Sequence, residues 1–202
     1  MKTVAIIFYS SSGHTAQMAE AVQRGAASMP GTETLLIPIE NKSIVEGRFQ
    51  NDPVLKQITS ADALIFGSPT YMGGVAAQFK AFVDATSGLW FSQAWKGKLA
   101  AGFTHSGSPS GDKLSTLQFL SLFAAQHSMI WVGTGELPSH YHGRTDGLNR
   151  LNSSLGVMGY GSQPPGAPAE VDPGDLLTAE HLGRRMASLA HQVGFNANRL
   201  AA

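Results

Sequence analysis

The chain has 202 residues, enough for one domain with a substantial core. Lys plus Arg equals Asp plus Glu, at 14 each, which argues against nucleic acid or an acidic membrane surface as a partner. There is no cysteine, so disulfides, thiolate nucleophiles and Cys-ligated metals are excluded.

The N-terminus combines Lys2 with an apolar run, as a secretory signal does, but the run is short. A helix pattern begins where a cleavage site would stand, so we interpret the run as the first strand of the fold. No apolar stretch approaches the ~20 residues that cross a bilayer. We therefore expect a cytoplasmic protein with no membrane or nucleic-acid partner, folded as a single domain over residues 1–202.

The stretch VAIIFYSSSGHT, residues 4–15, has the pattern of a strand, a tight loop and the start of a helix. Such a loop directs backbone N–H groups and the positive end of the helix dipole at one point, which suits a phosphate dianion. Its hydroxyls add donors, and Gly13 lets the backbone come close. Because the loop lacks the lysine of a Walker A motif, a monophosphate fits better than a nucleoside triphosphate. The alternative is an ordinary turn in which a serine caps the helix.

Segments with strand and helix patterns alternate along the chain. Helix patterns cover residues 14–28, 52–58, 75–83, 114–126 and 178–193, and further strand patterns cover residues 34–39, 61–66, 98–103 and 129–132. We expect Asp52 to cap the second helix, with Pro53 at its first position, and Thr178 to cap the last one. This alternation predicts an α/β fold, in which a parallel sheet is covered by helices on both faces.

Three loops rich in small residues each follow a predicted strand, at residues 10–13, 67–74 and 104–112. Ligands of open parallel sheets bind at the C-terminal ends of the strands, at the topological switch point. All three loops fall at that edge. The sequence therefore predicts one ligand site that the three loops build together.

Residues 136–173 form a long segment that is rich in Gly, Pro, Ser and His and has little periodicity. Loops of this length in a compact domain are functional, serve assembly or are mobile. His140 and His142 invite a metal interpretation, but no third ligand is evident, and we expect no metal. Arg184 and Arg185 fit a solvated face of the last helix.

Taken together, these stretches resemble the WrbA-type NAD(P)H:quinone oxidoreductases, which are FMN enzymes. The resemblance rests on YSSSGHT, on ADALIFGSPTYMGG with QFKAFVDATSGLW, on WKGKLAAGF, on QHSMIWVG and on the late GYGSQPP. It implies a flavodoxin-like three-layer sandwich around a five-stranded parallel sheet of order 2-1-3-4-5. It also implies a homo-oligomer, either a dimer or a tetramer.

The resemblance further implies which residues contact FMN. The first loop would hold the phosphate, the second would line the isoalloxazine edge, and the third would wrap the other side of the flavin. In chain order these residues are Ser10, Ser11, Ser12, Gly13, His14, Thr15, Pro69, Thr70, Tyr71, Met72, Gly73, His105, Ser106, Gly107, Ser108, Pro109 and Ser110. His127 would sit beside the ring, and Trp90 would overhang the flavin pocket of a neighbouring subunit.

The implied activity is the two-electron reduction of quinones by NADH or NADPH, in ping-pong order, with hydride transfer through flavin N5. His127 would stabilise the reduced flavin or donate a proton to the quinone; the alternative is a helix-terminal histidine stabilised by the dipole. Trp90, Phe91 and Trp95 would form a wall of the quinone site, or else belong to the core or to a subunit interface. His14 would orient the phosphate loop or face solvent.

Three rival functions share the fold and the cofactor. An electron carrier of the flavodoxin type would lack NAD(P)H activity, although such carriers tend to be strongly acidic and this chain is neutral. A regulatory protein would keep FMN without turning over NAD(P)H. An FMN reductase that releases its flavin would bind FMN loosely.

Overall fold

The computed structural model describes residues 1–164 and 166–193 of the chain. Its central sheet has the strand order β2-β1-β5-β7-β8, and these five neighbours are all parallel. The strands are β1 (Lys2–Phe8), β2 (Thr32–Pro38), β5 (Ala63–Tyr71), β7 (Leu99–Ser106) and β8 (Ile130–Trp131). The predicted fold class and the predicted order 2-1-3-4-5 are confirmed.

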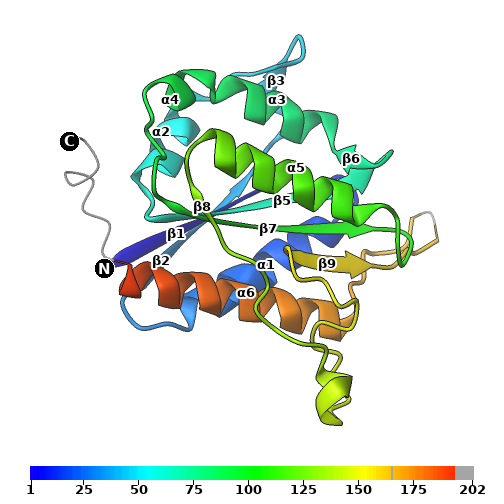
Figure 1. Cartoon of the computed structure of the whole chain (residues 1–202). Helices are drawn as coiled ribbons and strands as arrows, with labels where there is room; N and C mark the ends of the chain where they lie inside the picture. Colours follow the sequence, from blue (N-terminus) through cyan, green and yellow to red (C-terminus); the bar gives the residue numbers. More distant parts are fainter. Residues whose placement is uncertain (165, 194–202) are drawn as a thin grey trace.

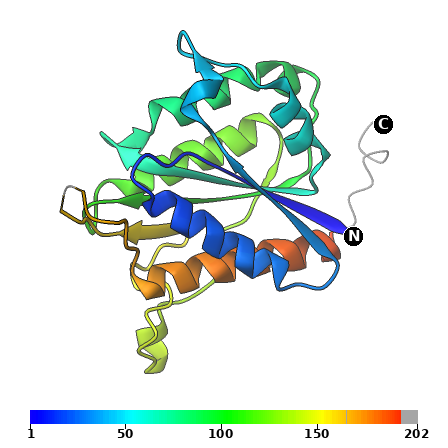
Figure 2. The same cartoon turned by 180° about the vertical axis from the view of Figure 1, so that it is seen from behind.

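The fifth position of the sheet is shared by two short strands. β8 pairs with Leu99 and Ala100 at the start of β7, and β9 (Val157–Tyr160) pairs with the last four residues of β7. The predicted strand 129–132 is therefore only the first half of this position. The chain between the halves carries the one-turn helix η2 (Ser139–His142), which projects from the body in both views (Figures 1 and 2).

Helices cover both faces of the sheet. α1 (His14–Ala27) and α6 (Pro173–Gln192) lie on one face, below the sheet in Figure 1. The other face is covered by α2 (Asp52–Ser60), α3 (Ala77–Ala85), α4 (Ser87–Phe91) and α5 (Lys113–Gln126). Over the described residues, no helix combines the length and the apolar character that crossing a bilayer requires.

The side-chain alternation of the strands creates two cores. In β1, Val4, Ile6 and Phe8 belong to the core between the sheet and α1 and α6. Ala5 and Ile7 belong to the core between the sheet and α3 and α5. Successive strand residues point to opposite faces, so a strand covered on both sides has to be apolar throughout. This double burial fixes the sheet, and with it the position of every loop that leaves its C-terminal edge.

Some predicted boundaries are wrong. Asn51, not Asp52, caps α2, since its side chain accepts a hydrogen bond from the N–H of Val54. α6 begins at Pro173, five residues before Thr178, and its cap is Asp172. Two short hairpins escaped the sequence patterns: β3 (Ile44–Val45) with β4 (Arg48–Phe49), which follows η1 (Asn41–Ser43), and β5 with β6 (Gly74–Val75). Strands of two residues are too short to show a period.

Candidate functional site

Ser10, directly after β1, orders the first loop. Its Oγ accepts hydrogen bonds from the backbone N–H groups of Gly13 and Ala16, each at 3.2 Å. Gly13 has a φ of +95°, and a Cβ added there would lie 2.9 Å from the Cβ of Ala169. Ser10 therefore takes the capping role at the start of α1, and Gly13 is required both by its backbone angle and by the lack of space.

His14, the first residue of α1, is half-buried and ties the first loop to two other segments. Its Nδ1 lies 3.0 Å from Ser12 Oγ, and its Nε2 is hydrogen-bonded to Gln163 Oε1. Because the amide oxygen only accepts, Nε2 carries the proton, and Ser12 donates to Nδ1 in the neutral ring. The ring stacks on that of His105, with centroids 4.6 Å apart. These contacts are those that the loop-orienting interpretation requires.

The second segment is more regular than predicted, because β5 runs on to Tyr71 and includes Pro69 and Thr70. Thr70 Oγ1 lies 2.8 Å from Thr104 Oγ1 and 2.7 Å from Thr116 Oγ1. The hydroxyl of Thr70 is thus committed to β7 and α5. Thr70 therefore contributes to the site by fixing the end of β5 against β7 and α5.

The tip of the β5–β6 hairpin stands beside the first loop. The hydroxyl of Tyr71 is hydrogen-bonded to that of Ser11, so the first and second segments touch. Met72 and Gly73 form the turn, with φ of +48° and +76°, angles that favour glycine and asparagine. The side chain of Met72 is fully exposed and stands clear of the pocket wall in the single chain.

The third segment also begins within a strand, because β7 ends only at Ser106 and the loop starts at Gly107. His105 is 4% exposed, and burial, reinforced by three nearby basic groups, lowers its pKa to about 4. Its ring is therefore neutral at pH 7. Residues 108–110 are exposed on the outside of the loop.

These segments converge on one pocket of about 320 Å³ at the C-terminal edge of the sheet. The expected residues that line it are Ser12, His14, Thr15, Pro69, Thr70, Tyr71, His105, Ser106 and Gly107. A fourth segment, residues 161–163 after β9, also lines it. Sequence reasoning gave this segment no role, because only the split fifth strand brings it to this edge; the GYGSQPP stretch was its one signal.

The pocket fits a phosphate monoester such as FMN. The first amides of α1 have no carbonyl of their own helix to bond, and hydroxyl groups stand around them. Within the described part of the chain, Nε2 of His105 is buried without a hydrogen-bond partner, as a group that awaits a ligand would be. Among the described residues no lysine or arginine lines the pocket, which suits a ligand held by neutral donors.

His127 and Trp90 do not line this pocket but lie elsewhere in the fold. α5 has 14 residues, hence about 20 Å of length, and the pocket lies at its start whereas His127 follows its end. His127 and Trp90 line a separate hollow of about 220 Å³ beside α3 and α4. His127 is therefore not among the residues that line the pocket of its own chain, and its contact with a flavin stays a prediction.

His127 is buried in its neutral form. Thr86 Oγ1 donates to the carbonyl of Val83 and lies 2.9 Å from Nε2 of His127, so Nε2 must donate to it and Nδ1 is bare. The ring packs on Trp95 and Phe123, and burial lowers its pKa to about 4. The single chain therefore disfavours the protonated ring that both dipole stabilisation and proton donation would need.

The three aromatic residues expected at a quinone site lie in two different environments. Trp95 is completely buried, and its Nε1 donates to Thr59 Oγ1 at 3.0 Å, so it belongs to the core and not to a site wall. Trp90 and Phe91 in α4 are 45% and 84% exposed. These two remain available to a second chain.

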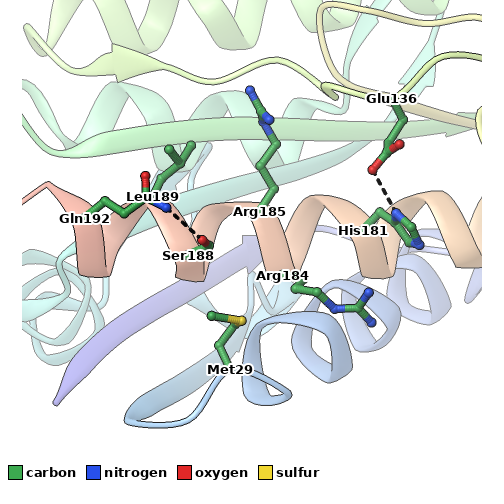
Figure 3. A pocket seen from close by; sticks show the side chains of 8 residues that line it. All are labelled: Met29, Glu136, His181, Arg184, Arg185, Ser188, Leu189 and Gln192. Atoms are coloured by element: carbon green, nitrogen blue, oxygen red, sulfur yellow. Dashed lines mark hydrogen bonds and ion pairs between the residues drawn. The ribbon is translucent and has the colours of Figure 1, made fainter.

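A hollow of about 540 Å³ lies where α1 and α6 end, at the edge opposite the loops. Figure 3 shows Arg184 and Arg185 on its walls, with side chains that diverge, while His181 Nδ1 lies 2.9 Å from Glu136 Oε1. The two guanidinium groups therefore do not converge on one anion. Among the described residues, no three His, Asp or Glu side chains gather as metal ligands would, and His140 and His142 lie on η2.

Known proteins match this chain over most of its length. The family model of the NADPH-dependent FMN reductases matches residues 1–143, which contain the first three segments of the pocket. The chain is 34% identical to the flavodoxin FldP of Pseudomonas aeruginosa over 196 residues, or 96% of this chain and 99% of that protein. It is 36% identical to an NAD(P)H dehydrogenase (quinone) of Geobacter sulfurreducens over 203 residues, or 93% of this chain and 97% of that one.

A solved structure agrees. The crystal structure of a flavodoxin, WrbA-like protein from Agrobacterium tumefaciens matches with a TM-score of 0.72 and 38% identity, covering 95% of this chain and 99% of that one. The resemblance inferred from the motifs is thereby confirmed. The chain belongs to the NADPH-dependent FMN reductase family, as a flavodoxin-like oxidoreductase that uses FMN with a reduced nicotinamide nucleotide as electron donor.

Proposed function

We propose that this protein catalyses the two-electron reduction of quinones by NADH or NADPH. The observation that carries the proposal is the convergence of the three predicted loops on one pocket, in a chain of this family. The relatives named NAD(P)H dehydrogenase (quinone) support a quinone as the acceptor.

FMN, when bound, supplies the acceptance and donation of hydride, and the chain positions it. Ser12, His14 and Thr15 are proposed to hold the phosphate at the positive end of α1, where the dipole favours an anion. Tyr71 and His105 are proposed to border the ring system. The remaining expected contacts act around them: Ser10, Ser11, Gly13 and Thr70 fix the segments, while Met72, Gly73 and residues 108–110 form the rim.

Nicotinamide and quinone are proposed to use the same face of this pocket in turn. The convergence of the segments on one shared pocket supports this order, since a donor bound there must leave before the acceptor enters. The result is ping-pong kinetics, seen as parallel double-reciprocal lines; intersecting lines would contradict it.

A second copy of the chain is proposed to complete the site. Trp90 and Phe91 are exposed, and Trp90 lines a hollow together with His127. Aromatic side chains of this kind are enriched at subunit interfaces. Trp90 and His127 would then form the wall that faces the flavin of the neighbouring chain, with His127 as a neutral, packed residue.

Anaerobic addition of NADH, and separately of NADPH, to the FMN-loaded protein tests the proposal. We expect prompt bleaching of the visible flavin absorption by at least one nucleotide, and its return when benzoquinone is added. Bleaching by dithionite but by neither nucleotide would instead favour the electron carrier, the alternative supported by the relative named flavodoxin. The cytoplasmic location stays a prediction.

A further inference from the structure

Lys113, the first residue of α5, is a fully buried lysine. Both its burial and its position are unfavourable in isolation. Taking an ammonium out of water costs free energy, and the start of a helix carries positive partial charge that repels a cation. Strong local compensation must therefore exist, and the structure shows where it comes from.

The loop that follows β7 closes around the Lys113 ammonium. Nζ donates to Ser106 Oγ at 2.9 Å, to the carbonyl of Ser108 at 2.6 Å and to the carbonyl of Pro109 at 2.9 Å. An ammonium has three hydrogens to donate, and all three are used by the end of β7 and the loop directly after it. Gly111 allows the tight fold, since a Cβ there would lie 2.2 Å from Ser106 Oγ.

This loop is part of the pocket wall. Ser106 and Gly107 line the pocket, and Ser106 is itself an acceptor of Lys113. Figure 1 shows α5 starting at the turn after β7, with β9 on the other side of that strand. The loop after β7, which the sequence analysis assigned to the flavin site, is therefore held in place by the buried ammonium of Lys113.

The charged groups around Lys113 come from several elements. Asp175 in α6 is paired with Arg150 through bonds of 2.8 and 2.7 Å, and Arg150 lies 3.3 Å from Asp172 as well. The ring of Tyr160 in β9 is centred 5.9 Å from Nζ, and the neutral His105 lies in β7. Burial lowers the pKa of Lys113 to about 8, with Asp175 opposing and Arg150 adding to the shift.

We propose that Lys113 is a positioning residue of the cofactor site, which holds Ser106 and Gly107 on the pocket wall and places a positive charge directly behind that wall. The inference rests on FMN binding in this pocket, and it is independent of quinone as the acceptor.

A dependence of FMN binding on pH follows. The FMN phosphate is a dianion near neutral pH, and a nearby anion raises the pKa of an ammonium. FMN therefore binds best while Lys113 is charged. In the free protein this charge is lost as the pH rises through about 8, so the dissociation constant of FMN increases above that pH.

The test compares the wild type with Lys113→Met and Lys113→Arg. The control is Lys98→Met, because Lys98 is a partly buried lysine that, like Lys113, donates to two backbone carbonyls; these are the carbonyls of Thr59 and Ala61, at the opposite end of β7. FMN is titrated by fluorescence into the flavin-free full chain from pH 6.5 to 9.5. Amide hydrogen exchange of residues 107–111 is measured on the same samples without FMN.

We expect Lys113→Met to weaken FMN binding by about tenfold at pH 7, the scale of a lost charge-assisted hydrogen bond, and to remove the rise above pH 8. Exchange of residues 107–111 should accelerate in Lys113→Met but not in Lys98→Met. Lys113→Arg, which keeps its charge, should restore binding and show no rise above pH 8.

Wild-type exchange and a wild-type FMN profile in Lys113→Met would overturn the proposal. Faster exchange with an unchanged pH profile would overturn its electrostatic half. If the wild type bound no FMN, the cofactor assignment would fail, and hydrogen exchange would still decide the positioning role. If Lys113→Met did not fold, the pH dependence of FMN binding to Lys113→Arg would decide. An increase in the dissociation constant of FMN above pH 8 in that variant would contradict the inference.

Discussion

At the scale of single residues, the structure buries two histidines and thereby keeps their rings neutral at pH values where solvent would protonate them. His105 and His127 are 4% and 2% exposed, and burial lowers the pKa of each from 6.5 to about 4. The folded chain therefore binds fewer protons than the unfolded chain between these pH values. Stability contributed by the neutral rings is present above pH 6.5 and is lost as the pH falls toward 4.

We expect this loss to be on the order of 3 kcal/mol for each histidine, from a shift of this size. Urea unfolding at pH 7, 5.5 and 4.5 measures it. His127→Gln keeps a donor for Thr86 but does not titrate, so its free energy of unfolding should fall less steeply with pH than that of the wild type. Equal pH slopes for the two proteins would show that His127 is not the buried neutral group described above.

At the scale of elements, the crossing of α1 and α6 depends on two glycines. A Cβ at Gly25 would lie 1.9 Å from the carbonyl oxygen of Glu180, and one at Gly183 would lie 2.0 Å from that of Val22. The backbones of the two helices therefore approach closely near the end of α1. Interiors of this density do not absorb an added methyl group without backbone movement.

Gly183→Ala should therefore destabilise the protein by at least about 2 kcal/mol, even though alanine is the better helix former. The control is Gly88→Ala in α4, where an added Cβ meets nothing within 4 Å; we expect it to change stability by less than about 1 kcal/mol. Thermal and urea denaturation of both variants decide the matter. Equal stabilities would mean that α6 shifts at no cost.

At the scale of the whole molecule, the pocket and the Trp90 hollow lie too far apart to serve one flavin within one chain. α5 separates them, with the pocket at its start and His127 after its end. A closed symmetric assembly solves this problem by bringing the hollow of one copy to the pocket of another. The proposed shared site therefore makes a prediction that no single-chain mechanism makes.

Two separately inactive variants should restore each other. Gly13→Val is expected to lose FMN because its φ and the nearby Ala169 exclude a side chain, and Trp90→Ala is expected to keep FMN but lose quinone turnover. When the two are co-expressed in equal amounts, random pairing gives about a quarter of the sites intact. Recovery of turnover supports the shared site. An inactive mixture, or full activity of Trp90→Ala alone, contradicts it.

The sequence by itself determined the fold class, and its resemblance to a known family supplied the strand order. Local patterns are sufficient for the fold class, because apolar runs such as residues 4–9 have to be buried on both faces of a sheet and alternate with helix patterns. It also indicated the first three segments of the pocket. The sequence patterns missed short elements, such as β9 and the two hairpins, because two to four residues show no period.

Only the tertiary structure decided which side chains meet. Residues 161–163 reach the pocket because β9 completes the fifth strand position, and the sequence separates β9 from β8 by a long irregular segment. Lys113 is hidden from pattern reasoning because a charged residue at a helix start resembles a solvated one. His127 lines a different hollow from the pocket of its own chain because it follows the end of α5, whereas the pocket lies at the start of that helix. Burial, pairing and distance arise from contacts between remote segments, and no local pattern encodes them.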